Sequence, residues 1–399
     1  MQAILESPAP FCEATDRYAV VRLSLTDFRC YPSLRLDADE RPVVLTGPNG
    51  AGKTNLLEAI SFFAPGRGLR RARLADVTRS DAPVGNGLRW AVSGTFAAAS
   101  GEIEIGTGFE PAFDGGDGGR RVVRLNGADA PNQMTLGEVF AAVWLVPEMD
   151  RLLLDGASGR RRFLDRLVSV FDPAHTRQLN EYEQAMRERT RLLRGERINS
   201  RAADASWLGA LEQRMAESGI AIAAARRLFV RRLLAASDLG VGPFPVASVA
   251  LVGDVEAWLQ ETAALQAEDN FKEALAQSRS ADREAGRALV GPHRSDIEVT
   301  NVSKGRPAAT CSTGEQKALL ISIVLAHARL VALDRGAPPV LLMDEVVAHL
   351  DKDRRAALFD EICAIGAQAW MTGTDRDLFR DFGDRAQYFQ VENAIAHSV

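Results

Sequence analysis

The sequence predicts an α/β fold with a mixed sheet, an antiparallel layer and an inserted helical lobe. Three observations predict it. The stretch GPNGAGKT at 47–54 follows the apolar run Val43–Leu45 and precedes a helical pattern, which is the context of a phosphate-binding loop. Another apolar run ends in Asp344 and Glu345. Between these motifs, apolar residues recur at helical spacing from Gly159 to about Leu239.

Composition places the chain among ordinary globular proteins. It has 399 residues, 46% hydrophobic and 25% charged, enough for two or three domains. The four cysteines form no CxxC pair, which favours reduced thiols in a cytoplasm and argues against a zinc site; they are Cys12, Cys30, Cys311 and Cys363. The net charge of −5 disfavours nucleic-acid binding over the whole surface, so any DNA contact requires local basic patches.

The chain divides into four expected segments. Residues 1–18 lack a basic start followed by an apolar core and are expected to be a loose leader. Residues 19–150 form the N-terminal part of the first lobe, 151–290 a helical lobe, and 291–399 the C-terminal part of the core. The sequence has no run of roughly 18 apolar residues, so no membrane-spanning segment is expected.

The P-loop is expected to bind the phosphates of ATP. Its glycines allow a tight turn that points several backbone N–H groups at one phosphate, and the following helix adds its positive dipole end. Lys53 supplies a charge for the β- and γ-phosphates, and the Thr54 hydroxyl is placed to bind Mg²⁺. The expected cofactor-binding residues are Gly47, Pro48, Asn49, Gly50, Ala51, Gly52, Lys53 and Thr54.

Strand patterns surround this motif. Alternation from Val21 to Leu25 predicts one strand, and a second is expected around Leu34 and Leu36. An antiparallel layer is expected from the runs Trp90–Phe96, Glu102–Ile105 and Val122–Leu125, with a glycine-rich turn at Asp114–Gly119. The run Val143–Val146 predicts another buried strand.

The helical stretch predicts a hairpin packed against its own lobe. Its first helix presents Leu179, Tyr182, Met186 and Leu193, and its second presents Leu208, Leu211, Met215, Ile222, Ala225 and Phe229. Gly195 and Asn199–Ser200 mark the break between the two. Further helix is expected over Val255–Leu275.

Two arginine groups are candidates for contact with DNA phosphates. The first follows the P-loop helix and the second opens the helical lobe; they are Arg67, Arg70, Arg71, Arg73 and Arg160, Arg161, Arg162. Arginine clusters neutralise phosphates and release counterions. Both groups could instead be solvated surface.

The apolar run Val340–Met343, followed by two acids, is a Walker B pattern. Asp344 is expected to hold Mg²⁺ through water, and Glu345 to act as the catalytic base that deprotonates the attacking water. The following residues, Ala348 to Asp351, resemble the D-loop of ABC-type ATPases. The fold class is therefore an ABC-type P-loop ATPase head.

The run from Cys311 to Ala318 resembles the ABC signature motif, with Ser312 and Gly314 at its serine and second glycine. Thr313 stands where glycine is usual. In ABC enzymes this loop meets the γ-phosphate of ATP bound to the other subunit, so an ATP-dependent homodimer is expected. A second interpretation is a helix N-cap at Ser312 with a capping-box acid at Glu315.

Over nearly its whole length the chain resembles the RecF family of ATPases, which are related to SMC heads. The motifs that carry the resemblance are LTDFRCY, TGPNGAGKTNLLEAI, GRGLRRAR, VPEMDRLLLDGASGRRRFLD, LVGPHRSD, STGEQKALLISIVLAHA and LLMDEVVAHLD. The resemblance implies that Ser312 serves ATP in trans and that Asp351 is the D-loop acid. It also implies slow ATP hydrolysis, binding to gapped or junction DNA, and cooperation with RecR and RecO in loading RecA, in support of replication and the SOS response.

Two departures from transporter ATPases bear on the alternatives. Glu148 stands where a Q-loop glutamine is usual, and Met371–Thr374 stand where a switch histidine is usual. Both favour slow turnover and disfavour a transporter subunit with a membrane partner. Another SMC-like head, and a scaffold that binds ATP without turnover, remain alternatives; Glu345 argues against the scaffold.

Overall fold

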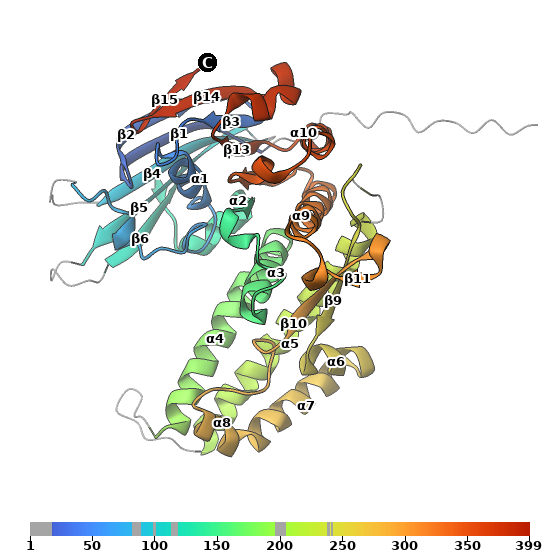
Figure 1. The fold of residues 1–399 in the computed structure, drawn as a ribbon. Helices are drawn as coiled ribbons and strands as arrows, with labels where there is room; N and C mark the ends of the chain where they lie inside the picture. Colours follow the sequence, from blue (N-terminus) through green and yellow to red (C-terminus); the bar gives the residue numbers. More distant parts are fainter. Residues whose placement is uncertain are drawn as a thin grey trace, which may run out of the picture.

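A computed structural model of the chain shows two lobes (Figure 1). It describes residues 18–81, 89–98, 101–112, 119–195, 205–237, 240 and 242–399. The expected leader up to residue 17, most of the glycine-rich turn at 114–119 and the break at 199–200 lie outside these residues. The β-rich lobe carries the P-loop and the Walker B acids, and a helical lobe extends from it.

The β-rich lobe is built on a mainly parallel sheet. In spatial order its strands are β15 (Ile395–Ser398), β14 (Gln387–Glu392), β3 (Val43–Thr46), β13 (Ala369–Gly373), β12 (Val340–Met343) and β8 (Ala142–Leu145). Only β15 runs antiparallel to its neighbour. Four strands, β3, β8, β12 and β13, are buried at every position, as expected of parallel strands covered on both faces.

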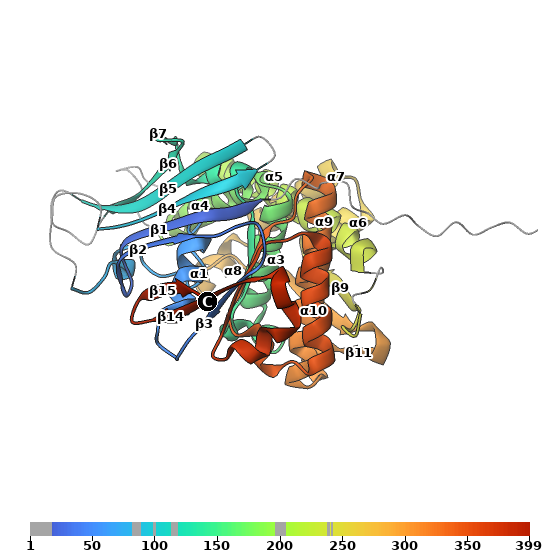
Figure 2. The same ribbon diagram turned by 90° about the horizontal axis from the view of Figure 1, so that it is seen from above.

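The second sheet is the expected antiparallel layer. Its strands lie in the order β2 (Tyr31–Asp37), β1 (Ala19–Phe28), β4 (Trp90–Ala98), β5 (Gly101–Pro111), β6 (Gly119–Leu125) and β7 (Ala128–Asp129). In Figure 2, β1 and β4 to β6 run side by side as one twisted sheet. The layer is thus larger than predicted, because β1 and β2 belong to it.

Alternation along β3 assigns each face of the parallel sheet to a different core. Val43 and Leu45 face a cluster shared with the antiparallel sheet and α1 (Lys53–Ser61). Val44 faces a second cluster that contains α9 (Thr313–Arg335). Short helix α2 (Leu136–Val139) and helix α10 (Lys352–Ile365) complete this lobe. The P-loop helix is therefore held between two sheets.

Helix α9 is apolar and long enough to span a bilayer by composition, but 83% of its apolar window is buried inside the protein. It packs in the core between α5, α10 and the parallel sheet. Its composition therefore reflects burial within this fold, as for many central helices of globular proteins.

The described part of the helical lobe contains six α-helices. They are α3 (Ala157–Phe171), α4 (Ala174–Leu193), α5 (Ala205–Ser237), α6 (Asp254–Glu261), α7 (Ala264–Gln277) and α8 (Arg279–Ala285). Helices α4 and α5 form the predicted hairpin and enclose a core with α7. The last buried residue of α4 is Leu192 and not the expected Leu193. The buried face of the helix contains Tyr182, Ala185 and Arg189, and Leu192 follows these at helical spacing.

The helix expected over Val255–Leu275 is present as two helices, α6 and α7. Thr262 and Ala263 have extended backbones and separate α6 from α7. The Thr262 hydroxyl donates a hydrogen bond to the Trp258 carbonyl at 2.9 Å. Because that carbonyl also accepts from the Thr262 N–H at 2.8 Å, the threonine closes the helix end locally. The break allows Val255 and Phe271 to enter one core.

A small sheet crosses the expected boundary at 290/291. Strand β9 (Ala247–Val252) pairs antiparallel with β10 (Asp296–Asn301) over six residue pairs, and β11 (Arg306–Pro307) pairs with β10. Strand β9 was not predicted, since its stretch was expected to be helical. Val249 and Val299 pack into the same core as α9, so this sheet ties the helical lobe to the β-rich lobe.

Arg189 organises the end of the helical lobe. Its side chain is 0% exposed. It donates to Glu212 at 2.9 Å, to Asp282 at 2.6 Å and to the Leu275 carbonyl at 2.6 Å. One guanidinium therefore joins α4, α5, α7 and α8. A buried cation of this kind is tolerated because each of its three nitrogens donates to an acceptor and two of those acceptors are carboxylates.

We expect Arg189→Met to destabilise the helical lobe by about 3–5 kcal/mol, because it leaves buried Asp282 without its cation and leaves Glu212 paired only with Arg279. Urea unfolding followed by circular dichroism measures this loss. The matched control is Arg187→Met, which removes an exposed pair with Glu183 at 3.4 Å and should cost at most about 0.5 kcal/mol. Equal midpoints for the two variants would contradict the assigned role of Arg189.

Candidate functional site

The P-loop lies where β3 ends and α1 begins, as the sequence predicts. Gly47, Gly50 and Gly52 have φ of 145°, 81° and 110°, in the region that disfavours side chains. A Cβ at Gly47 would overlap the Val391 carbonyl, and one at Gly52 would lie 2.6 Å from the Tyr31 hydroxyl. Glycine is therefore required at both positions by space as well as by conformation.

Lys53 lies at the start of α1 and is 5% exposed. Its ammonium donates hydrogen bonds to the carbonyls of Gly47 at 2.6 Å and Pro48 at 2.9 Å. Burial lowers the pKa of Lys53, while the carboxylates of Asp344 and Glu345 act in the opposite direction. The charge is thus held over the loop by the loop's own carbonyls, at the place where phosphates would meet the N–H groups of the helix start.

Two threonine hydroxyls converge on Asp344. Thr54 Oγ1 lies 3.0 Å from both carboxylate oxygens, and Thr372 Oγ1 donates to Oδ1 at 2.6 Å. The carboxylate is 5% exposed at the end of β12. A hydroxyl beside a carboxylate is a hard oxygen set of the kind that binds Mg²⁺ together with substrate phosphates. These residues fit the expected cation.

Glu345 has a left-handed backbone, with φ of 51°. This conformation costs a non-glycine residue about 1–2 kcal/mol and is held by a hydrogen bond from the Glu345 N–H to Thr372 Oγ1 at 2.9 Å. Within the described parts of the chain, no donor contacts its carboxylate. The side chain is therefore free to accept a hydrogen bond from water, as a general base requires.

Ser312 begins α9 and forms the capping box that the second interpretation predicts. Its N–H donates to Glu315 Oε2 at 2.8 Å, and its Oγ accepts from the Glu315 N–H at 3.4 Å. Lys304 pairs with the same carboxylate and, with these bonds, lowers the pKa of Glu315 to about 2. Ser312 is exposed, and a Cβ added at Gly314 would point into open space. Among the described residues, no contact joins Ser312 to the P-loop.

Asp351 is the N-cap of α10. Its carboxylate accepts a hydrogen bond from the Arg354 N–H at 2.8 Å and is exposed. A capping role explains its position in the fold. Its expected role beside ATP stays a prediction.

Two contributors to the site went unrecognised in the sequence. Thr372 lies where a switch histidine was sought, and it binds both Asp344 and the Glu345 backbone. Lys317 of α9 is 6% exposed; its ammonium lies 3.4 Å from Asp150 Oδ2 and 3.5 Å from the Glu345 carbonyl. The only sequence signal for Lys317 was its place one turn after Ser312.

The candidate DNA-binding arginines separate into two sets. Arg67, Arg70, Arg71 and Arg162 line one cleft of about 650 Å³, as does Arg166. Arg160, by contrast, binds both oxygens of Asp296 at 2.8 and 2.6 Å, and Arg161 donates to the Ser295 carbonyl at 2.6 Å. Arg73 is exposed outside the cleft lining.

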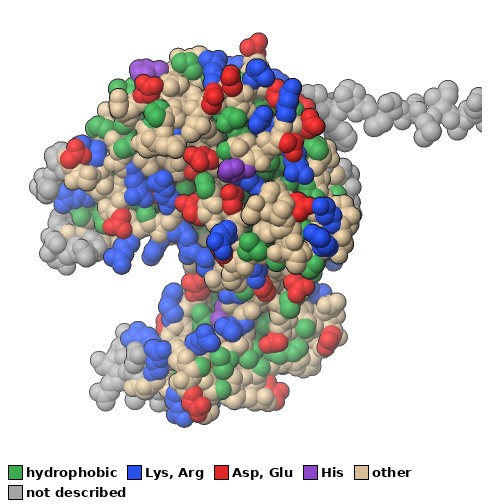
Figure 3. Space-filling model, viewed as in Figure 1, with side chains coloured by type: hydrophobic (Ala, Val, Ile, Leu, Met, Phe, Trp, Pro, Cys, Tyr) green, Lys and Arg blue, Asp and Glu red, His purple; other side chains and the backbone are tan. Residues whose placement is uncertain are grey.

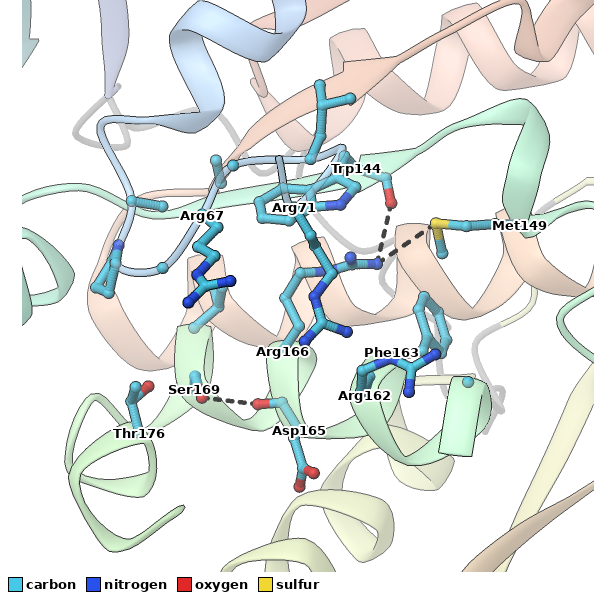
Figure 4. A pocket seen from close by; sticks show the side chains of 18 of the residues that line it. Arg67, Arg71, Trp144, Met149, Arg162, Phe163, Asp165, Arg166, Ser169 and Thr176 are labelled. Carbon is cyan, nitrogen blue, oxygen red and sulfur yellow. Dashed lines mark hydrogen bonds between the residues drawn. The ribbon is translucent and has the colours of Figure 1, made fainter. Parts of the chain in front are cut away.

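The basic cleft, as we name this cavity, lies between the lobes. Figure 3 shows Lys and Arg side chains along its margin, on the underside of the β-rich lobe and on the facing part of the helical lobe. In Figure 4, Arg67 and Arg71 point from the loop after α1 toward α3, and Arg162 and Arg166 of α3 point toward them. Segments far apart in the sequence thus form one basic surface.

Known proteins match this chain over nearly its full length. The profile of the RecF/RecN/SMC N-terminal domain matches residues 19–397. The chain is 49% identical over 376 residues to the DNA replication and repair protein RecF of Mesorhizobium japonicum, covering 94% of this chain and 96% of that protein. It is also 49% identical over 378 residues to RecF of Brucella suis, covering 94% and 95%.

Solved structures agree on the fold. A structure of the recombination mediator protein RecF with ATP, in the RecFOR pathway, superposes with a TM-score of 0.81 at 22% identity and covers 97% of this chain and 99% of that one. The Smc head domain of Pyrococcus furiosus gives a TM-score of 0.51 at 16% identity, with 96% of each chain covered. The predicted fold class and family resemblance are confirmed.

We expect Thr372→Val to lower the ATP hydrolysis rate about 10- to 100-fold, because loss of a supporting hydroxyl misplaces the groups it holds. Affinity for ATP, measured with a fluorescent analogue, should change by no more than a few fold. Thr372→Ser keeps the hydroxyl and serves as the matched control. Wild-type phosphate release by the valine variant would show that Thr372 only fills space.

Proposed function

The chain belongs to the RecF family of DNA replication and repair proteins, and we propose that it uses ATP to close a homodimer around DNA. In this proposal the dimer helps RecO and RecR load RecA at single-strand gaps, in support of replication and the SOS response. The protein acts in the cytoplasm without a membrane partner. One observation carries the proposal: the site at Lys53, Thr54 and Asp344 is built within the chain, while no described contact joins Ser312 to it.

The residues on the parallel sheet support ATP hydrolysis. Lys53 and the N–H groups of the P-loop bind the phosphates, and Thr54 and Asp344 hold the cation. Mg²⁺, when bound there, offsets the charge of the phosphates. The Glu345 carboxylate takes a proton from the attacking water, and its left-handed backbone, bound to Thr372, fixes where that carboxylate points. Without a switch histidine, turnover is slow.

Ser312 and Gly314 complete the site of a second copy. The start of a 23-residue helix carries a partial positive charge, and here it is exposed. A helix start exposed in this way can meet the γ-phosphate held by a partner head, with Asp351 beside it. ATP then contributes binding energy to dimerisation, so nucleotide state controls oligomeric state.

DNA is held by the basic cleft. Exposed arginines on both lobes face one space, which suits backbone phosphates from successive nucleotides. Arg67, Arg70, Arg71 and Arg162 are the first candidates; Arg73 lies outside the cleft, and Arg160 and Arg161 are engaged with β10. Base sequence is not read by such contacts, so we expect a preference for structure, as at gapped or junction DNA.

We expect the purified protein to bind gapped duplex DNA about tenfold more tightly with ATP than without nucleotide, measured by fluorescence anisotropy. Affinity should fall steeply with salt, since each phosphate contact contributes about 0.9 to the logarithmic salt slope. Arg71→Gln and Arg162→Gln should weaken binding and reduce that slope. Arg35→Gln, on an exposed pair with Asp37, is the control. Equal affinity for DNA with and without ATP would contradict the proposed ATP-dependent clamping of DNA.

We expect Ser312→Arg to leave ATP binding by the monomer intact and to abolish ATP-dependent dimerisation. The reason is that the arginine side chain would occupy the space of the γ-phosphate held by the partner head. Sedimentation velocity with ATP measures this. Lys53→Met should lose ATP binding and dimerisation together, and Ser33→Arg on exposed β2 should lose neither. If the Ser312 variant dimerised normally with ATP, the trans arrangement would be wrong.

A further inference from the structure

The basic cleft contains a partly buried arginine, Arg166, that pairs with no acid among the described residues. Arg166 lies on α3, and its Nε is fully enclosed without a hydrogen-bond partner. Among the described residues, its Nη2 donates only to the Trp144 carbonyl at 3.3 Å and to Met149 Sδ at 3.6 Å. Burial, together with the nearby charge of Arg71, lowers the pKa of Arg166 to about 9. An enclosed donor without a partner costs free energy, and a ligand that binds the guanidinium would offset that cost.

The acids that line the cleft are neutralised from outside it. Asp165 binds Arg226 through both oxygens at 2.8 Å. Glu183 pairs with Arg187 at 3.4 Å, and Asp155 lies 3.8 Å from Arg151. These cations do not line the cleft. They neutralise three of the four acids that do, so those three acids do not offset the positive charge of the lining arginines.

The arginines that line the cleft are mostly unpaired. Arg70 is bound to Glu58 at 3.2 Å. Arg67, Arg71 and Arg162 have no ion pair with any described residue, nor has Arg166. Of the lining acids only Glu148 is likewise unpaired among described residues. The space thus has four unmatched guanidinium groups against one carboxylate, and it strongly favours an anion.

The backbone of Arg71 is in an unfavourable conformation. Its backbone has φ of 55°, a left-handed conformation that an arginine adopts at about 1–2 kcal/mol. Its guanidinium nonetheless projects into the cleft beside Arg166 and Arg162 (Figure 4). Strain and like-charge crowding at one place are typical of a binding site.

The ligand must be larger than a lone phosphate. The cleft has a volume of about 650 Å³, within the range of small-molecule sites. Its inner wall is apolar and includes Phe140, Trp144, Val146, Leu152 and Phe163. Arg166 lies 4.3 Å from the centre of the Trp144 ring. A phosphate alone would leave this wall uncovered.

We propose that the inner part of the basic cleft binds one nucleoside phosphate, with its phosphate on Arg71, Arg162 and Arg166 and its base against the apolar wall. Guanidinium groups bind phosphate oxygens in pairs, and a base supplies the flat apolar face. The source is either the phosphate-bearing end of a DNA strand or a free nucleotide. The strand-end form rests on the proposed DNA binding; the free-nucleotide form does not.

The test uses the Lys53→Met chain, in which the P-loop no longer competes for nucleotide. One arm titrates dAMP and follows the unfolding temperature. The other compares gapped duplexes that are identical except for a terminal phosphate at the gap, by anisotropy. We expect the phosphate to strengthen binding about tenfold, or dAMP to raise the unfolding temperature, and Arg166→Met and Arg162→Met to abolish either effect.

Controls separate this site from general charge loss and from misfolding. Arg73→Met removes an exposed arginine outside the cleft and should keep the full effect. Arg162 is itself exposed, so Arg162→Met tests the site even where Arg166→Met fails to fold. Arg166→Met should not lower the unfolding temperature without ligand, because it removes an uncompensated charge.

The outcomes are distinguishable. A terminal-phosphate effect lost in the variants supports the strand-end source, and dAMP stabilisation without that effect supports a free nucleotide. Neither effect in a chain that still binds gapped duplex overturns this inference and leaves the proposed function standing. Loss of all duplex binding, with dAMP still stabilising, overturns the proposed function and keeps the site.

Discussion

The structure depends on the register of three parallel strands. Pairing of Thr46 with Gly373 and of Met343 with Met371 brings the ends of β3, β13 and β12 to one edge of the sheet. Ligands bind at this edge in open α/β sheets. Thr54, Thr372 and Asp344 converge there because the strands end together. A slip of one residue would turn Thr372 to the other face and would remove its bonds to both acids of the Walker B strand.

The two buried arginines of the described chain, Arg189 and Arg226, are paired with carboxylates, whereas the partly buried Arg166 is not. Glu58, 0% exposed, binds Arg29 and Arg70, and Arg189 has two carboxylates. The chain is acidic overall, with a net charge of −5, so acids are available for pairing. Their absence around Arg166 is therefore a property of that place. On a chain of net negative charge, a concentrated basic cleft favours binding of DNA phosphates at that cleft over the rest of the surface.

Local patterns in the sequence predicted the parts of the site that one segment builds. The P-loop and the strand before Asp344 follow from glycine spacing and apolar runs, because both motifs depend on residues adjacent in the chain. Thr372 and Arg166 depend on tertiary neighbours. A threonine that ends a strand and an arginine in a charged helix have no distinctive local pattern. Strand β9 was missed for the same reason: its pairing with β10 joins segments separated by three helices.

The same strands position the ATP site and the basic cleft. Leu342 of β12 pairs with Trp144 of β8, and the Asp344 N–H donates to the Leu145 carbonyl at 2.9 Å. Trp144 forms part of the cleft wall beneath Arg166. Lys317 adds a second connection, since it contacts the Glu345 carbonyl and Asp150, which lies shortly before α3.

Asp344 and the cleft wall are therefore fixed by one rigid strand pair, whereas the 3.4 Å contact to Asp150 is partly exposed. Because a buried strand pair does not deform locally, any coupling between nucleotide and DNA must act through movement of α3 and α9 relative to that sheet.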